Sequence, residues 1–202
     1  MDANDYIGPG DKPAPHETAL LLVDIQNDYF PGGKNELEGS VAASRRAGEL
    51  LALCRRLELP IIHVQHVSTR PGATYFLPDT AGVRIHESVA PIAGELVLQK
   101  HYPNAFRDKQ LLVQLGLKHV ARLVICGMMT HMCVDATVRA ACDLKFECIL
   151  AGDACAAKAL AHEGRTVAAQ DVHAAFLAAL DGTYAKVMSF LEVAALLSSP
   201  KA

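Results

Sequence analysis

The sequence predicts an α/β protein, a three-layer α/β/α sandwich around a central, mostly parallel sheet of six strands. Short apolar runs alternate with helix-length amphipathic segments along the chain, which is typical of a parallel sheet with helices on both faces. The 202 residues, 51% hydrophobic and 20% charged, suffice for one core but not for two. We therefore expect residues 1–17 to form a flexible N-terminal arm and residues 18–202 a single domain.

The first predicted strand is the apolar run Ala19–Val23, which stops at Asp24. Continuous apolar runs favour strands buried on both faces. A helix is expected from Ser40, whose hydroxyl can cap it, to about Leu57, because apolar residues recur there at helical spacing. Ile61–Val67 is the second predicted strand.

A short third strand, Leu96–Leu98, ends at Gln99-Lys100. The long irregular segment before it contains several prolines and glycines, and at this length a loop is more often functional than a simple connection. Residues 108–116 form the next predicted helix, and Ala121–Cys126 the fourth strand.

The remaining segments continue the alternation of strand and helix. They are predicted as a helix from about His131 to Leu144, a strand Glu147–Ala151, a helix from about Thr166 to Leu180, a strand near Tyr184–Met188 and a terminal helix.

Charge and composition exclude several classes of protein. The net charge is -3 and no long Lys/Arg run occurs, which argues against nucleic-acid or membrane partners. The longest apolar stretches fall short of the ~18 residues of a membrane span. The six cysteines lack C-x-x-C spacing, and Met1–Gly10 shows no export signal. We expect a cytoplasmic protein with reduced thiols, acting on a small-molecule substrate.

Three reactive side chains follow predicted strands. Asp24 follows the first strand, Lys100 the third, and Cys133 lies in the first turn of the helix after the fourth. In parallel sheets, ligands bind beyond the carboxyl ends of the strands. An acid, an ammonium and a thiol at one edge can form an activated nucleophile. Taken singly, each also has an ordinary explanation as a turn cap, a solvated lysine or a core cysteine.

Three motifs stand out by their order and spacing. They are residues 19–33 (ALLLVDIQNDYFPGG), Gln99-Lys100 with Asn104-Ala105-Phe106, and residues 126–134 (CGMMTHMCV). Through them the chain resembles, from about residue 18 to 197, the isochorismatase-like cysteine hydrolases, which include nicotinamidases, N-carbamoylsarcosine amidases and ureidoacrylate hydrolases.

The resemblance implies a catalytic triad of Asp24, Lys100 and Cys133. Cys133 would be the nucleophile, Asp24 its proton acceptor, and Lys100 the charge that holds the thiolate. It also implies a cis peptide at Met128-Met129 and an oxyanion hole formed by the backbone N–H groups of Met129 and Cys133. A helix N-terminus and an ammonium can lower a thiol pKa from about 8.5 to roughly 3.5–7.5, which predicts a thiolate at neutral pH.

The implied reaction is hydrolysis of a C–N bond in a small amide, ureido or carbamoyl compound through a thioester, without a cofactor. No metal is expected either. The metal-holding Asp-x-His of nicotinamidases is missing from the segment His63-Val64-Gln65-His66, and two histidines three residues apart on a strand point to opposite faces. His66 is interpreted as a residue of the pocket wall or of the structural frame.

Five further residues near the predicted edge are candidates for binding substrate: Gln26, Phe30, Asn104, Phe106 and His131. The resemblance also implies a homo-oligomer, either a dimer or a tetramer.

Two alternatives stay open. One is an isochorismatase-type ether or ester hydrolase that does not use the cysteine, although members of that type lack the nucleophilic Cys. The other is a non-catalytic small-molecule binding protein on the same scaffold, because fold alone does not decide function.

Overall fold

A six-stranded sheet forms the centre of the computed structural model, which describes residues 17–199. The strand order is β3-β2-β1-β4-β5-β8, and all neighbouring strands pair in parallel. The strands are β1 Thr18–Val23, β2 Ile61–His66, β3 Leu96–Lys100, β4 Arg122–Met128, β5 Glu147–Ala156 and β8 Lys186–Met188. The predicted parallel sheet is confirmed, whereas most of the predicted arm lies outside the described residues.

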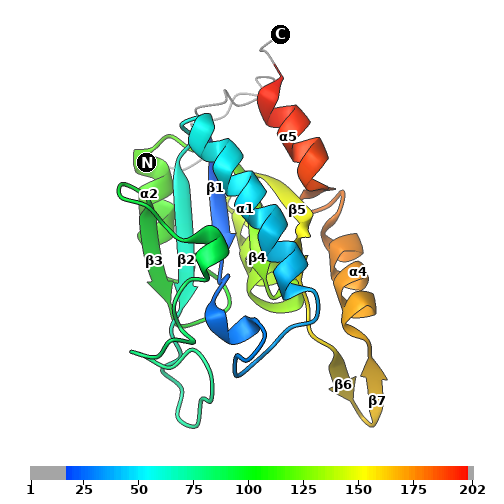
Figure 1. Ribbon diagram of the computed structural model, residues 1–202. Helices are drawn as coiled ribbons and strands as arrows, with labels where there is room; N and C mark the ends of the chain where they lie inside the picture. The colour runs from blue at the N-terminus through cyan, green and yellow to red at the C-terminus, as the bar shows by residue number, and fades with distance from the viewer. Residues whose placement is uncertain (1–16, 200–202) are drawn as a thin grey trace.

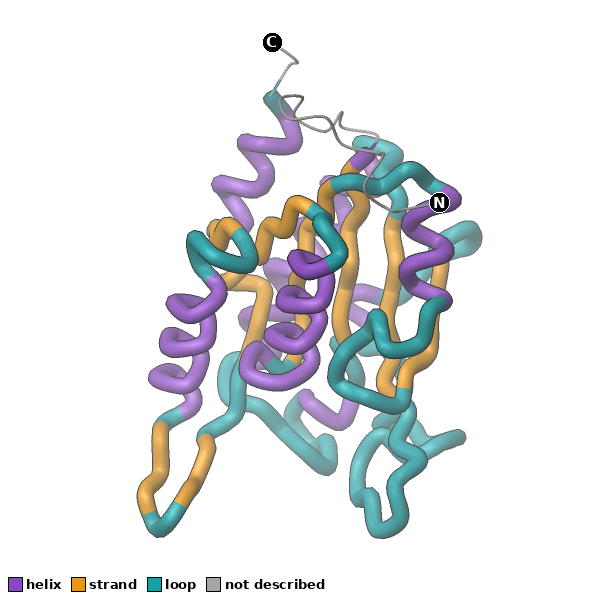
Figure 2. Tube along the Cα trace, turned by 180° about the vertical axis from the view of Figure 1, so that it is seen from behind, coloured by secondary structure: helices purple, strands orange, loops and turns teal. Residues whose placement is uncertain are grey.

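Helices cover both faces of this sheet. They are α1 Ser40–Arg56, α2 Gln110–Leu117, α3 Asp135–Asp143, α4 Ala169–Leu180 and α5 Phe190–Ser198. α1 crosses one face (Figure 1), and the view from behind shows helices in front of the opposite face (Figure 2). The three-layer arrangement is therefore as predicted.

The two central strands supply the middle of the core. Every residue of β1 and β4 is buried, which explains why their sequences are continuous apolar runs rather than alternating patterns. Beyond the strands, the core includes Leu50 and Leu51 from α1 and Val138 from α3.

The region after β5 differs from the prediction. β5 continues to Ala156, and Thr166 belongs to a strand rather than to a helix. β6 Leu160–His162 and β7 Arg165–Val167 form an antiparallel hairpin that projects from the body (Figure 1). Glu163 and Gly164 both have positive φ, which suits a two-residue hairpin turn. Because the hairpin occupies the residues up to Val167, α4 begins only at Ala169.

The helix expected from His131 is also divided. A π-type turn, η5 Thr130–Val134, comes first, and α3 begins at Asp135. Two 3-10 turns, η3 Asn27–Tyr29 and η4 Glu87–Val89, lie in the loops after β1 and β2.

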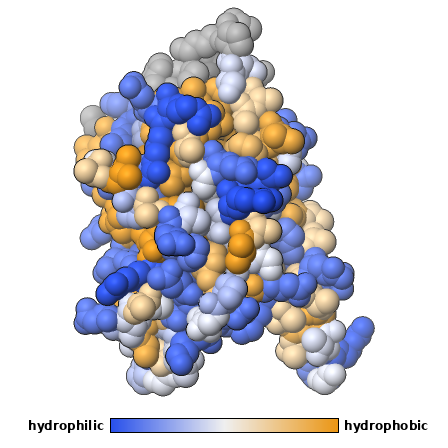
Figure 3. Space-filling view, viewed as in Figure 1, coloured by the Kyte–Doolittle hydropathy of each residue, from blue (hydrophilic) through white to orange (hydrophobic). Residues whose placement is uncertain are grey.

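The parallel strands bring their carboxyl ends to one edge of the sheet. The arrows of β1, β2 and β3 point to this edge, and the loops that follow β1 and β2 lie beyond it (Figure 1). On the face shown in Figure 3, hydrophilic and hydrophobic residues are interspersed. Within residues 17–199, no helix is long and apolar enough to cross a membrane.

Candidate active site

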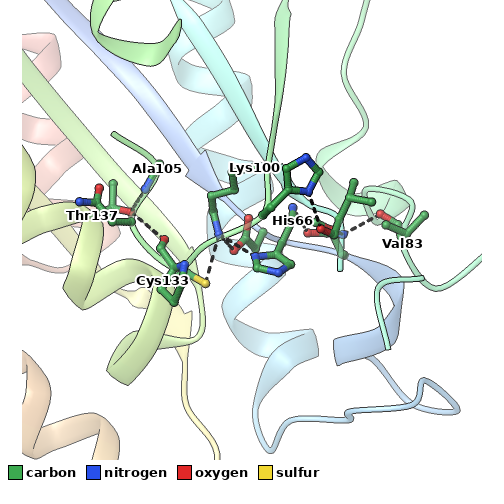
Figure 4. Close-up of polar contacts among 12 residues, drawn as sticks. His66, Val83, Lys100, Ala105, Cys133 and Thr137 are labelled. Atoms are coloured by element: carbon green, nitrogen blue, oxygen red, sulfur yellow. Dashed lines mark hydrogen bonds and ion pairs between the residues drawn. The ribbon is translucent and has the colours of Figure 1, made fainter. Parts of the chain in front are cut away.

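Asp24, Lys100 and Cys133 meet at this edge. The ammonium nitrogen of Lys100 lies 2.6 Å from Oδ2 of Asp24 and 3.2 Å from Sγ of Cys133. All three residues are buried, and Figure 4 shows the Lys100 amine beside the Cys133 sulfur. Lys100 thus contacts both other members of the expected triad.

Two of the side chains are placed by strand ends and the third by the turn after β4. Asp24 leaves β1 with a φ of 51°, and its backbone N–H donates to the carbonyl of Val64 at 3.0 Å. Lys100 is the last residue of β3. Cys133 lies in η5, which directly follows the cis Met128-Met129 peptide bond. The carbonyl of Met129 accepts hydrogen bonds from the N–H groups of Met132 and Val134.

Lys100 carries a positive charge in this arrangement. Burial alone would lower its pKa, but the neighbouring Asp24 carboxylate outweighs that effect and raises it. Asp24 and Lys100 therefore form a buried ion pair.

The surroundings of Cys133 shift its pKa upward, the opposite direction from the lowered pKa that the sequence predicts. Burial raises the pKa of Cys133, the negative charge of Asp24 raises it further, and Lys100 only partly opposes them. The predicted thiolate depends on the ammonium and the helix alone, whereas burial and Asp24 act in the opposite direction.

The second carboxylate oxygen of Asp24 is available to take the thiol proton. Oδ1 is buried and has no hydrogen-bond partner within residues 17–199. A carboxylate oxygen of Asp24 and Sγ of Cys133 lie within 4.8 Å of each other. A buried acceptor without a partner next to a thiol suits a general base.

His66 joins the cluster through a contact that the sequence argument did not identify. Its Nδ1 lies 3.1 Å from the Lys100 nitrogen (Figure 4). Burial and the nearby Lys100 charge lower the pKa of His66 to about 4, so the ring is neutral near pH 7. The position of His66 could have indicated this contact, because His66 ends β2 and pairs in register with Lys100 on β3.

Asp24, His66 and Cys133 have the side-chain chemistry of a metal site. One ligand atom from each lies within 4.8 Å of the others. However, the Lys100 ammonium contacts all three residues and occupies the position that a cation would take. The other histidine of β2, His63, binds Glu95 at 2.9 Å, so the two rings have different partners.

Gln26, a candidate for substrate binding, is engaged with the protein itself. Its Nε2 donates to the carbonyls of His66 at 2.9 Å and Val83 at 2.7 Å, and its Oε1 accepts from the N–H of His66 at 2.7 Å. The Gln26 amide thus ties the end of β2 to the loop after it.

The other four candidates lie in separate packing environments. Phe30 stacks on His86, with ring centroids 3.5 Å apart. Asn104 accepts from the N–H of Phe106 at 2.8 Å, and the Phe106 ring packs against Phe146. His131 is buried, and its Nδ1 has no partner among the described residues. Their contact with substrate stays a prediction.

Two contacts with distant segments were not predicted. Thr130 Oγ1 lies 2.9 Å from Nδ1 of His173, which attaches η5 to α4. The N–H of Phe76 donates to Asp28 at 2.6 Å, and the Phe76 ring lies 5.8 Å from that of His66. No local pattern marks such pairs, because their members are more than 40 residues apart.

Fold and site together define a parallel α/β protein with an Asp–Lys–Cys cluster at the carboxyl edge of its sheet. Comparison with known proteins agrees, because the Isochorismatase domain matches residues 18–189. The chain belongs to the isochorismatase family of hydrolases.

Three relatives illustrate the similarity. The isochorismatase family protein YddQ of Bacillus subtilis is 48% identical over 170 residues, covering 84% of this chain and 94% of that protein. A solved isochorismatase-family structure from Oleispira antarctica has a TM-score of 0.86 and 48% identity, and the match covers 92% of this chain and 100% of that one. Maleamate amidohydrolase of Pseudomonas putida is 32% identical over 148 residues, 65% of this chain and 66% of that protein.

Proposed function

We propose that the protein is a cysteine hydrolase that cleaves a C–N bond in a small amide, ureido or carbamoyl compound. The observation that carries this proposal is the Lys100 ammonium, held between the Asp24 carboxylate at 2.6 Å and the Cys133 sulfur at 3.2 Å. The similarity to a maleamate amidohydrolase supports the same bond type.

In the first half-reaction, Sγ of Cys133 attacks the substrate carbonyl while Oδ1 of Asp24 takes the thiol proton. The negative oxygen of the tetrahedral intermediate accepts hydrogen bonds from the N–H groups of Met129 and Cys133. Collapse breaks the C–N bond, and the leaving nitrogen takes the proton from Asp24. The products are a thioester on Cys133 and ammonia or an amine.

In the second half-reaction, water attacks the thioester and Asp24 accepts the proton that the water loses. The C–S bond breaks, the acid product leaves, and the proton on Asp24 returns to the sulfur. One water is consumed for each C–N bond broken. Throughout, Lys100 stabilises the negative charge that passes between Asp24 and Cys133.

The test is ammonia release from a panel of primary amides, carbamoyl and ureido compounds, after treatment with a chelator. Wild type is compared with Cys133→Ala and with Cys142→Ala, which removes a half-buried thiol on α3. We expect turnover in wild type and Cys142→Ala and none in folded Cys133→Ala. Activity in folded Cys133→Ala would reject the proposal and favour an ether or ester hydrolase that depends on Asp24.

A further inference from the structure

The Lys100 ammonium uses all its hydrogen-bond capacity inside the site. An ammonium has three N–H donors, and Lys100 has three acceptors within reach, on Asp24, Cys133 and His66. Among the described residues, His66 is thus one of three groups that orient the Lys100 ammonium, and it does so through an imidazole nitrogen.

This contact decides which nitrogen of His66 carries the proton. Because the ammonium can only donate, Nδ1 of His66 must accept and cannot itself be protonated. The hydrogen of the neutral ring is therefore on Nε2. Within residues 17–199, the hydrogen bond of the His66 ring is made at Nδ1 and none is made at Nε2, and His66 is only half-buried.

The backbone of His66 is held in place, and one aromatic ring lies beside its side chain. The Gln26 amide binds both the N–H and the carbonyl of His66, at 2.7 and 2.9 Å, and the Phe76 ring packs beside the imidazole. A donor fixed in this way is organised in advance for a ligand. The groups that surround His66 are Asp24, Lys100, His101 and Arg70, of which two carry positive charge.

We infer that His66 has two roles: it positions Lys100 through Nδ1, and it donates from Nε2 to a carboxylate of the substrate. A ring nitrogen of His66 lies within 4.8 Å of Sγ of Cys133, so an acyl group on the sulfur places its neighbouring atoms beside the imidazole. The substrate class is therefore an amide or ureido compound with a carboxylate close to the scissile carbonyl. This substrate assignment rests on the proposed function.

The test alkylates Cys133 with iodoacetamide and iodoacetate at pH 8, locating the product by peptide mass spectrometry. In each reaction the thiol proton passes to solvent, an Sγ–C bond forms, and the C–I bond breaks to release iodide. Iodoacetate brings a carboxylate one bond from the reacting carbon. The variants are His66→Ala and His66→Asn. The control is His101→Ala, a neighbouring exposed histidine whose Nδ1 binds the carbonyl of Val67 at 2.8 Å.

The positioning role predicts that iodoacetamide reacts at least about threefold more slowly with His66→Ala. His66→Asn should stay within about twofold of wild type, because its side-chain oxygen can accept from Lys100 in place of Nδ1. Equal rates in wild type and folded His66→Ala, or rates in His66→Asn as slow as in His66→Ala, would overturn this role.

The recognition role predicts a change in the ratio of the iodoacetate rate to the iodoacetamide rate. That ratio should fall at least about threefold in both His66 variants, because both lose the Nε2 donor, and should not change in His101→Ala. An unchanged ratio in His66→Asn would reject carboxylate recognition, even if His66→Ala did not fold. Since alkylation needs no turnover, failure of the ammonia assay alone would reject the proposed reaction and not the contacts of His66.

Discussion

Lys100 and Asp24 form an ion pair of 2.6 Å in which the side chains are only 3% and 0% exposed. Asp24 directly follows β1 and Lys100 ends β3, and the two residues are 76 positions apart in the sequence. Neither charge has access to bulk water, so each depends on the other for its stability.

Removing one member of this pair should cost more stability than removing both. Lys100→Met leaves the Asp24 carboxylate buried without its counter-charge and should lower the free energy of unfolding by about 3–5 kcal/mol. Asp24→Asn/Lys100→Met, which leaves no charge, should recover much of that loss. Urea unfolding at pH 7 measures both values, and a double variant no more stable than Lys100→Met would contradict the ion-pair interpretation.

Loss of the ammonium should also create a zinc site. In Lys100→Ala, the side chains of Asp24, His66 and Cys133 remain within 4.8 Å of one another without the cation that now separates them. Oxygen, nitrogen and thiolate ligands suit Zn²⁺. Competition with a coloured chelator should detect one zinc per chain, bound tightly enough to protect Cys133 from alkylation.

The matched control for this prediction is Lys100→Ala/His66→Ala, which lacks the nitrogen ligand. It should bind zinc at least about tenfold more weakly. Equal zinc affinity of the single and double variants would show that the three side chains do not form the ligand set.

Glu95 should make the stability depend on acidic pH. Its carboxylate is 2.7 Å from Arg55 and 2.9 Å from His63. Burial tends to raise the pKa of Glu95, but the hydrogen bonds from Arg55, the Ile92 N–H and His63 lower it from 4.5 to about 2. The unfolded chain therefore binds a proton at a higher pH than the folded chain, so the stabilisation is complete above pH 4.5 and is lost as the pH falls toward 2.

Glu95→Gln should remove this dependence. We expect the variant to be less stable than wild type by about 2 kcal/mol at pH 7, and the difference to shrink between pH 4.5 and 2. Urea unfolding over this pH range measures the difference. If it stayed constant with pH, the lowered pKa of Glu95 would be wrong.

Gly127 should tolerate no side chain. It has a φ of +136°, and a Cβ at this position would overlap the backbone carbonyl of Val23 on the neighbouring strand. We expect Gly127→Ala to lose more than about 3 kcal/mol of unfolding free energy. Gly116 in α2 has open space around it, so Gly116→Ala should be neutral or up to about 1 kcal/mol more stable. Thermal unfolding of the two variants compares them, and similar melting temperatures would contradict the prediction.

Local sequence patterns predicted most of the sheet. The apolar runs that became β1 and β4 can be buried only on both faces, and a parallel sheet with helices is the arrangement that allows it. The parallel arrangement also predicted that Asp24, Lys100 and Cys133 lie at one edge, because consecutive parallel strands end on the same side. The β6–β7 hairpin was missed because its short strands lack an alternating apolar pattern and are exposed throughout.

By itself, the sequence determined the central strands, the edge that holds the candidate site and the three reactive side chains, because these depend on local periodicity and chain direction. Only the tertiary structure decided that burial and Asp24 raise the pKa of Cys133, that His66 contacts Lys100 and that Gln26 holds the backbone of His66. Protonation depends on how completely water is excluded, and such contacts depend on how distant segments pack together. Neither is recorded in the spacing of residues along the chain.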